Sequence, residues 1–290
     1  MINYVPYHDI DKAKYDYCIY HSRAYRIYAL SWYLDCVTDR WDVLIEGDYD
    51  SVMPLPRKTK YGIDYVYTPS WVQQLGLFSL GKTSEKTQHE FLKSISKKFL
   101  WVDYHLNSSY KRASEVMRIK KNYLLSLEGG LEKIQANYNK NRKRILKRSF
   151  DNLVLDKKGD IELFIENYKN QDKPYAISED AIDLLKCLYF KGKGHVHVWN
   201  VFFENEFLAG LVWLEDAHRI TYLAPLADER AKQLHMPTYL IHELIKDFQG
   251  HQMVLDFEGS MVSGVENFYQ SFGAQAESYY YFKKRFIDHV

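Results

Sequence analysis

A short apolar run ends in polar residues at alternate positions, namely Asp256, Glu258 and Ser260. Their side chains could move protons or bind a polar substrate. The run covers residues 253–257 and is bounded by glycines, which favours a buried strand. Alternate strand residues point to one side, so both carboxylates would share a face. Neutralising a lysine-like amine at pH 7 costs about 4.6 kcal/mol, so a nearby base would assist acyl transfer to it. The alternative is that a carboxylate only caps the loop.

Behind this loop, residues 265–271 have helical spacing and carry Tyr269. A tyrosine beside acidic and hydroxyl groups is a combination that acyl transfer to an amine could use. The alternative is a helix tyrosine that packs against the sheet.

Residues 131–150 form a helix-prone segment that is strongly basic. It carries six cations in nine residues: Lys140, Arg142, Lys143, Arg144, Lys147 and Arg148. Hydrogen bonds from such side chains to a phosphate contribute about 1.5 to 3 kcal/mol each. Two interpretations stay open, a solvated helix that bridges two domains and a clamp for a phosphate-bearing substrate.

The composition is that of a folded protein, with 46% hydrophobic and 27% charged residues. A net charge of +1 argues against a general polyanion binder. Three widely spaced cysteines without a CxxC pair exclude a disulfide framework and a structural zinc site, and no histidine has a carboxylate at metal-ligand spacing. The first residues do not resemble a signal peptide and no apolar window is long enough to span a membrane, so we expect a cytoplasmic protein without bound metal.

The C-terminal half predicts a clear order of elements: a strand, two helices, a three-strand antiparallel meander, a helix, a strand, a helix and a strand. These elements cover residues 153–156, 161–168, 178–190, 195–203, 207–215, 218–224, 237–248, 253–257, 265–271 and 278–286. Pro237 is placed as the first residue of the helix after the meander.

The N-terminal half repeats this order more loosely. Its predicted elements are a helix at 11–22, strands at 43–46, 51–55 and 63–67, a helix at 84–97, and closing strands at 99–106 and 121–127. We therefore predict an α/β (α+β) fold of two tandem modules, each a mixed central sheet flanked by helices. The expected boundaries are 1–128, a basic connecting helix at 129–150, and 151–290; one continuous large sheet is the alternative.

This order resembles the GNAT acyltransferase fold, and two such modules in one chain are similar to Fem-type proteins, which include peptidoglycan-bridge aminoacyltransferases. The segments that carry the resemblance are 52–56, 69–79, 139–146, 256–260 and 268–274. The resemblance implies an acyl- or aminoacyltransferase that moves an acyl group from a CoA thioester or an aminoacyl-tRNA to an amine in a cleft between the modules. Expected partners are an amine-bearing, phosphate-linked substrate and, with the second donor, tRNA.

The resemblance also implies roles for single residues. Tyr269 stands four residues before Gly273, as does the GNAT tyrosine that donates a proton to the departing thiolate. Arg142 matches the arginine with which Fem-type proteins hold a diphosphate, and we expect Lys140 and Arg144 to assist it.

One stretch departs from the GNAT pattern. A CoA-binding module opens the helix after its meander with a glycine-rich turn whose amides hold the pyrophosphate. Residues 230–239 contain no glycine, and Pro237 removes one amide donor. An aminoacyl-tRNA donor would not need this turn. The alternative function is therefore a non-catalytic GNAT-fold binding protein that has lost its acyl-CoA site.

Overall fold

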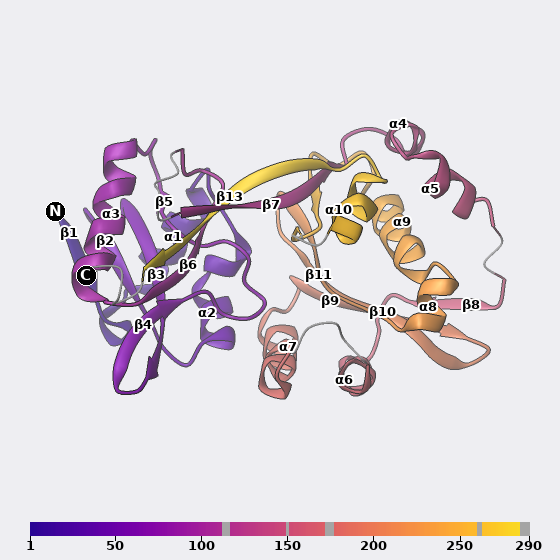
Figure 1. The fold of residues 1–290 in the computed structure, drawn as a ribbon, viewed down its shortest axis with the longest axis horizontal. Helices are drawn as coiled ribbons and strands as arrows, with labels where there is room; N and C mark the ends of the chain where they lie inside the picture. The colour runs from indigo at the N-terminus through magenta and orange to yellow at the C-terminus, as the bar shows by residue number, and fades with distance from the viewer. Residues whose placement is uncertain (112–116, 149–150, 172–176, 260–262, 285–290) are drawn as a thin grey trace. The chain divides into compact units, whose positions relative to one another are not determined.

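A computed structural model describes the chain except residues 112–116, 149–150, 172–176, 260–262 and 285–290 (Figure 1). The side chains of residues 96–97 and 263 are also left out. The chain divides into two units, of which unit 1 comprises Met1–Lys120 and Ser278–Val290, and unit 2 comprises Lys121–Glu277. Each unit contains a mixed β-sheet and helices, which confirms the expected α/β class with two modules.

The sheet of unit 1 has the strand order β1-β2-β3-β4-β6-β13, with β5 paired to β3. Its strands are β1 (Ile2–Val5), β2 (Trp41–Glu46), β3 (Ser51–Lys60), β4 (Ile63–Tyr67), β5 (Phe78–Ser79), β6 (Val102–Leu106) and β13 (Gln275–Lys284). Its helices are α1 (Lys12–His21), α2 (Ser31–Val37) and α3 (Glu85–Lys98). Side-chain oxygens of Asp11 and Ser84 accept first-turn amides of α1 and α3, which starts these helices where the sequence predicts.

The sheet of unit 2 has the strand order β7-β12-β11-β10-β9-β8. Its strands are β7 (Met117–Ser126, in unit 2 from Lys121), β8 (Leu153–Asp156), β9 (Val196–Phe203), β10 (Glu206–Glu215), β11 (Arg219–Ala227) and β12 (Val254–Asp256). Its helices are α4 (Leu131–Ala136), α5 (Lys140–Ile145), α6 (Ile161–Asn170), α7 (Glu179–Lys191), α8 (Glu229–Gln233), α9 (Met236–Phe248) and α10 (Ser263–Gln270). Ser178 accepts the amide of Ala181 and caps α7, as the sequence indicates.

Both units repeat one order of elements. In unit 1 the antiparallel meander β2-β3-β4 is followed by α3 and then by β6, which pairs in parallel with β4. In unit 2 the antiparallel meander β9-β10-β11 is followed by α8 and α9 and then by β12, which pairs in parallel with β11. A parallel neighbour requires a crossover connection, and the helices supply it. The predicted repeat is confirmed.

Helices cover both faces of the sheet in unit 2, with α9 and α10 on one face and α6 and α7 on the other (Figure 1). The α9 face holds the main core, to which Ile220, Leu255 and Phe257 contribute. On the α6 face Gly210 lies so close to Phe164 that a β-carbon would come within 2.7 Å of its ring. A glycine therefore lets α6 approach the sheet closely.

Residues 131–150 do not form the single helix that the sequence predicts. They contain two short helices, α4 and α5, separated at residues 137–139. The side chain of Asn139 accepts the amide of Arg142 at 2.9 Å and so begins a new helix. A capping side chain in the middle of a helix-prone run competes with continuation of that helix.

The last strand does not close the unit that the sequence predicts. β13 pairs with β6 of unit 1, where Phe282 lies opposite Tyr104. The segment 121–126, expected to close the N-terminal module, pairs instead with β12 of unit 2. Residues 121–128, expected in the N-terminal module, lie in unit 2, and residues 278–284, expected in the C-terminal module, lie in unit 1. β1 and α2 were not predicted at all.

Candidate functional site

β11 and β12 separate at Asp256, which is where the sequence places the acidic loop. Their parallel pairing ends with Thr221 opposite Asp256, although β11 continues to Ala227. The next residue, Phe257, donates its amide to the carbonyl oxygen of Tyr123 at 3.0 Å, so the chain stays beside β7. The end of β12 thus turns away from β11 at the predicted site.

Asp256 is held by two partners. Its side chain is 1% exposed and forms an ion pair with Arg219 on β11. Its Oδ1 accepts the backbone amide of Glu258 at 2.8 Å. The cation and the amide replace hydrogen bonds to water that the carboxylate loses on burial. Asp256 therefore fastens the turn, as the alternative interpretation of the sequence has it.

Glu258 does not continue the alternation of the strand. Its φ is +58°, and Gly259 follows with φ of +63°. A β-carbon on Gly259 would come within 2.1 Å of the carbonyl oxygen of Lys121. This close approach requires glycine, and the turn that it makes directs Glu258 away from the position that a strand would give it. Ser260 lies outside the described residues.

Tyr269 lies on α10 with 8% of its surface exposed. Its ring stacks on that of Phe257 at a centroid distance of 4.6 Å and lies 6.5 Å from Tyr222 and 6.3 Å from Tyr123. The tyrosine is thus packed against the sheet within an aromatic cluster, which is the alternative that the sequence left open.

The structure does not bring Tyr269 and Asp256 to the same face of the sheet. Leu255 and Phe257 point into the core that contains Tyr269. Asp256 stands between them, so its side chain points to the opposite face, where it meets Arg219. Tyr269 and Asp256 are linked through the backbone of β12 and not by contact of their polar groups.

A second polar group lies beside Tyr269. Burial, together with the nearby carboxylate of Glu266, raises the pKa of Tyr123 to about 12. The Tyr123 hydroxyl and the ammonium of Lys121, 3.1 Å away, lower the pKa of Glu266. Sequence reasoning missed this group because Tyr123 and Glu266 are far apart along the chain and match no motif.

Arg142 reaches from α5 to the first turn of α9. Its Nη1 donates a hydrogen bond to the hydroxyl of Thr238, and its guanidinium lies 4.8 Å from the ring centroid of Phe268 and 5.6 Å from that of Phe272. Burial lowers the pKa of this guanidinium. The arginine is thus held between α9 and α10, over the ring of Phe268, which precedes Tyr269 in the sequence.

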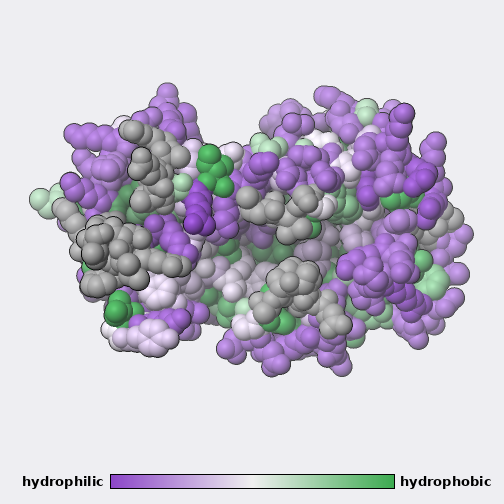
Figure 2. All heavy atoms as spheres, viewed as in Figure 1, coloured by the Kyte–Doolittle hydropathy of each residue, from purple (hydrophilic) through white to green (hydrophobic). Residues whose placement is uncertain are grey.

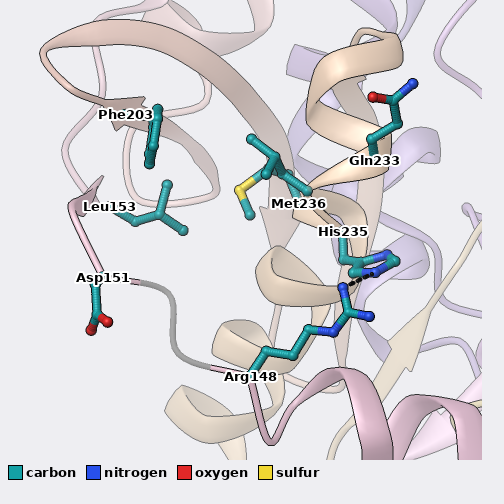
Figure 3. Close-up of a pocket in the computed structure, with 8 residues that line it drawn as sticks. Arg148, Asp151, Leu153, Phe203, Gln233, His235 and Met236 are labelled. Carbon is teal, nitrogen blue, oxygen red and sulfur yellow. Dashed lines mark hydrogen bonds between the residues drawn. The ribbon is translucent and has the colours of Figure 1, made fainter.

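Arg148 approaches the same end of α9 (Figure 3). Its Nη1 donates to Nε2 of His235 at 3.0 Å, and both line an open pocket of about 190 Å³ together with Gln233 and Met236. Burial, followed by the charges of Arg148, Arg142 and Arg144, lowers the pKa of His235. The histidine is therefore neutral at pH 7 and can accept this hydrogen bond. In the sequence, only the basic run at 140–148 indicates a site here, because it contributes Arg148 to the pocket.

The other cations of the segment are exposed. Lys140 and Arg144 lie on the outer side of α5, and Arg144 contacts Asn141 at 2.9 Å. Figure 2 shows hydrophilic side chains gathered over α4 and α5. Within the described part of the chain, none of the six cations at 140–148 forms an ion pair. The segment therefore presents positive charge that no carboxylate neutralises.

Two further properties concern metals and membranes. In the described ranges, no three histidine, cysteine or acidic side chains gather as a metal site would require. None of the helices described is both long and apolar enough to cross a bilayer.

Residues 133–268 match the family model of the acetyltransferase (GNAT) domain. This segment lies within unit 2 and contains Arg142, Arg148, Asp256 and Glu258. The sequence of unit 2 is therefore similar to a GNAT domain, and this similarity agrees with the repeated fold. A comparison with curated protein sequences gave no match.

Solved structures match the chain along nearly its full length. FemX has a TM-score of 0.65, with 10% identity and 94% of this chain and 96% of its own covered. A tandem GNAT protein from the clavulanic acid biosynthesis pathway has a TM-score of 0.56, 8% identity and 98% coverage of each chain. The C-terminal domain of a putative lysylphosphatidylglycerol synthetase from Agrobacterium fabrum has a TM-score of 0.55 and 9% identity. The match covers 96% of this chain and 93% of that domain's chain. The chain thus has the Fem-like tandem GNAT fold, as the resemblance predicted.

Proposed function

We propose that the protein is an N-acyltransferase that moves an acyl or aminoacyl group to an amine and holds a phosphate-bearing substrate at the first turn of α9. The tandem GNAT fold supports acyl transfer in general. The observation that carries the proposal is that Arg142 and Arg148 converge on Thr238 and His235, and that neither arginine forms an ion pair within the described residues. A phosphate would supply the missing negative charge through charge-assisted hydrogen bonds.

The donor is a CoA thioester or an aminoacyl-tRNA. Both carry phosphate groups that the two arginines could bind. The α8–α9 junction is a poor backbone cradle for phosphate, because it has no glycine to allow close approach to the amides and Pro237 has no N–H. Side chains would therefore bind the phosphate in place of a glycine-rich turn. Lys140 and Arg144, which are exposed on α5, would extend the positive surface toward a larger polyanion such as tRNA. This arrangement favours the aminoacyl-tRNA donor.

We assign proton handling to residues near the end of β12. Tyr269 would donate to the leaving group, because a tyrosine hydroxyl with an ordinary pKa near 10 carries its proton at neutral pH. Glu258 would assist removal of the amine proton, while Asp256 keeps its partner Arg219 and holds the turn. Ser260 is proposed to contact the substrate. The placement of the acceptor between the modules, expected from the sequence, stays a prediction.

A turnover assay tests this function. Purified protein is incubated with acetyl-CoA or with a mixture of aminoacyl-tRNAs and a panel of primary amines, and the acylated product is identified by mass spectrometry. Arg142→Ala and Arg148→Ala should raise KM for the donor or the phosphate-linked acceptor. Lys246→Ala, at the other end of α9, is the control and should leave KM unchanged. Absence of turnover with every donor would contradict the proposal.

The second candidate is a non-catalytic binding protein with a GNAT fold. The burial of Tyr269 and the ion pair that occupies Asp256 favour it. Thermal-shift measurements distinguish the two, because a ligand that binds the folded state raises Tm. Stabilisation by a donor supports the enzyme, whereas stabilisation by an acceptor alone, without turnover, supports the binding protein.

A further inference from the structure

Strands β3 and β4 form a hairpin in unit 1, which Figure 1 shows. Its register gives the hairpin two unlike faces. Its register sets Lys58 opposite Tyr65 and Lys60 opposite Ile63. Because opposite residues of an antiparallel pair share a face and neighbours along a strand alternate, Tyr67 lies on this face as well. One face of the hairpin therefore combines two lysines with aromatic and aliphatic side chains.

The other face of the hairpin is polar and internally neutralised. Asp64 pairs there with Arg57 at 2.9 Å and with Arg40 at 3.5 Å, and it accepts a hydrogen bond from Thr59. These contacts lower the pKa of Asp64, with Thr59 as the largest cause. The carboxylate is thus bound by groups of its own face, and in the described part of the chain Lys58 and Lys60 form no ion pair.

Aromatic rings organise the lysine-bearing face. Tyr65 stacks on Trp101, which precedes β6, with centroids 4.4 Å apart and planes 17° apart. The ammonium of Lys58 lies 5.0 Å from the ring centroid of Tyr67, and that of Lys60 lies 5.9 Å from that of Trp101. The rings are therefore held in a fixed arrangement, with lysine charges distributed over them.

Apolar groups project from the free end of the hairpin and from the loop beside it. Tyr61 is 90% exposed, Ile63 47% and Leu100 46%. Figure 2 shows green and pale residues at this end of the hairpin, where the neighbouring surface of the unit is purple. Exposed aliphatic side chains next to tyrosine, tryptophan and lysine are typical of a surface that enters the boundary between lipid headgroups and acyl chains.

We propose that this face of the β3–β4 hairpin binds the surface of an anionic phospholipid bilayer. Tyr61, Ile63 and Leu100 would enter the headgroup layer, while Lys58 and Lys60 bind lipid phosphates. Lysine carries its charge on a long apolar stem, which suits it to this position. The contact is peripheral, so it requires no membrane-spanning helix.

The observations favour a bilayer over single-stranded RNA. RNA-binding platforms offer free aromatic faces on which bases stack. Here Tyr65 and Trp101 stack on each other, and lysine ammoniums lie over Tyr67 and Trp101. Exposed isoleucine and leucine add nothing to base stacking, whereas they add apolar area to insertion in lipid.

Co-sedimentation of the full chain with vesicles tests the proposal. The probes are vesicles of phosphatidylcholine alone, vesicles of phosphatidylcholine and phosphatidylglycerol at a ratio of 3:1, and poly(U) RNA. We expect binding to the phosphatidylglycerol vesicles that weakens with salt. Lys58→Glu/Lys60→Glu should weaken this binding roughly 30-fold or more, because each lysine near an anionic surface contributes about 1 kcal/mol. Tyr61→Ser/Ile63→Ser, which leaves the charge unchanged, should weaken it as well.

The matched control is Lys82→Glu/Lys86→Glu, which makes the same charge change at exposed positions of the same unit. It should keep more of the binding than the hairpin charge variant. Tm measurements should show all three variants folded, because the changed side chains are exposed. No binding to the anionic vesicles, binding to poly(U) only, or an equal loss in the control would overturn the proposal.

Discussion

Arg142 donates a hydrogen bond from its guanidinium to the hydroxyl of Thr238, a buried residue in the first turn of α9. The same guanidinium lies over the ring of Phe268 on α10. Among the residues that the structure describes this arginine has no carboxylate partner, and neutral groups from two helices fix it. Such an arrangement keeps the charge in place and leaves it available to an anion.

Removing this charge should weaken binding of the phosphate-bearing substrate. Arg142→Ala is expected to raise KM about 10- to 100-fold with a small change in kcat, because a charge-assisted hydrogen bond contributes about 1.5 to 3 kcal/mol. Thr238→Val should raise KM less than Arg142→Ala does. Thr238→Ser should keep the wild-type KM, because serine retains the hydroxyl. Steady-state kinetics check both expectations; an unchanged KM in Arg142→Ala would exclude the assigned role.

Tyr269→Phe separates chemistry from packing. The ring would still stack on Phe257, so the free energy of unfolding should change by less than about 1 kcal/mol. If the hydroxyl donates a proton in the rate-limiting step, kcat should fall about 100-fold or more. Tyr222→Phe, which removes a hydroxyl from the same cluster, is the control. Equal kcat values for wild type and Tyr269→Phe would remove Tyr269 from the mechanism.

Asp256→Asn should act mainly on stability. It breaks a largely buried ion pair by removing the charge of one partner, which costs about 3 to 5 kcal/mol. The exposed pair of Lys157 and Asp247 offers a comparison, and Asp247→Asn should cost less than about 1 kcal/mol. Urea unfolding measures both. Similar losses in the two variants would mean that burial of the Asp256 pair has no special effect.

Two glycines with positive φ test the close approach of the turn after β12. Gly259→Ala would place a β-carbon 2.1 Å from the Lys121 carbonyl oxygen, whereas Gly250→Ala would meet open space. Both carry the cost of a left-handed conformation, about 1 kcal/mol. We expect Gly250→Ala to lower the free energy of unfolding by only this amount, and Gly259→Ala to lower it by at least about 1 kcal/mol more. Equal losses in chemical unfolding would show that the turn relaxes at little cost.

His105 should make unit 1 less stable in mild acid. Burial lowers its pKa in the folded protein from 6.5 to about 4. As pH falls below 6.5 the unfolded chain binds a proton that the folded chain does not, so this destabilisation grows until about pH 4 and is absent above pH 6.5. Between pH 6.5 and pH 4 this shift lowers the free energy of unfolding by about 3 kcal/mol in total.

The variant His105→Gln should show a smaller decrease in stability between pH 6.5 and pH 4 than wild type. His89→Gln, at an exposed position of α3, is the control and should keep the wild-type pH dependence. Urea midpoints at several pH values measure the effect. A wild-type slope in His105→Gln would assign the acid sensitivity to other groups.

Local sequence patterns predicted most of the fold. The β8 strand begins and ends where the sequence predicts, and α6, α7 and α9 agree within two residues, because their apolar spacing and capping residues depend only on near neighbours. The break between α4 and α5 has a local signal in Asn139, whose capping contact was not anticipated. The pairing of β13 with β6 has no local signal, since strand partners are chosen among residues far apart in the chain.

The sequence by itself determined the kind of side chain available at the candidate site: the basic run around Arg142, the carboxylates after β12 and the tyrosine on α10. Only the tertiary structure decided how these groups are arranged. It set Asp256 and Tyr269 on opposite faces of a sheet and brought Arg142 and Arg148 to the first turn of α9. The physical reason is that spacing along a chain specifies a face or a cap, whereas the direction and partner of a side chain depend on packing between distant elements.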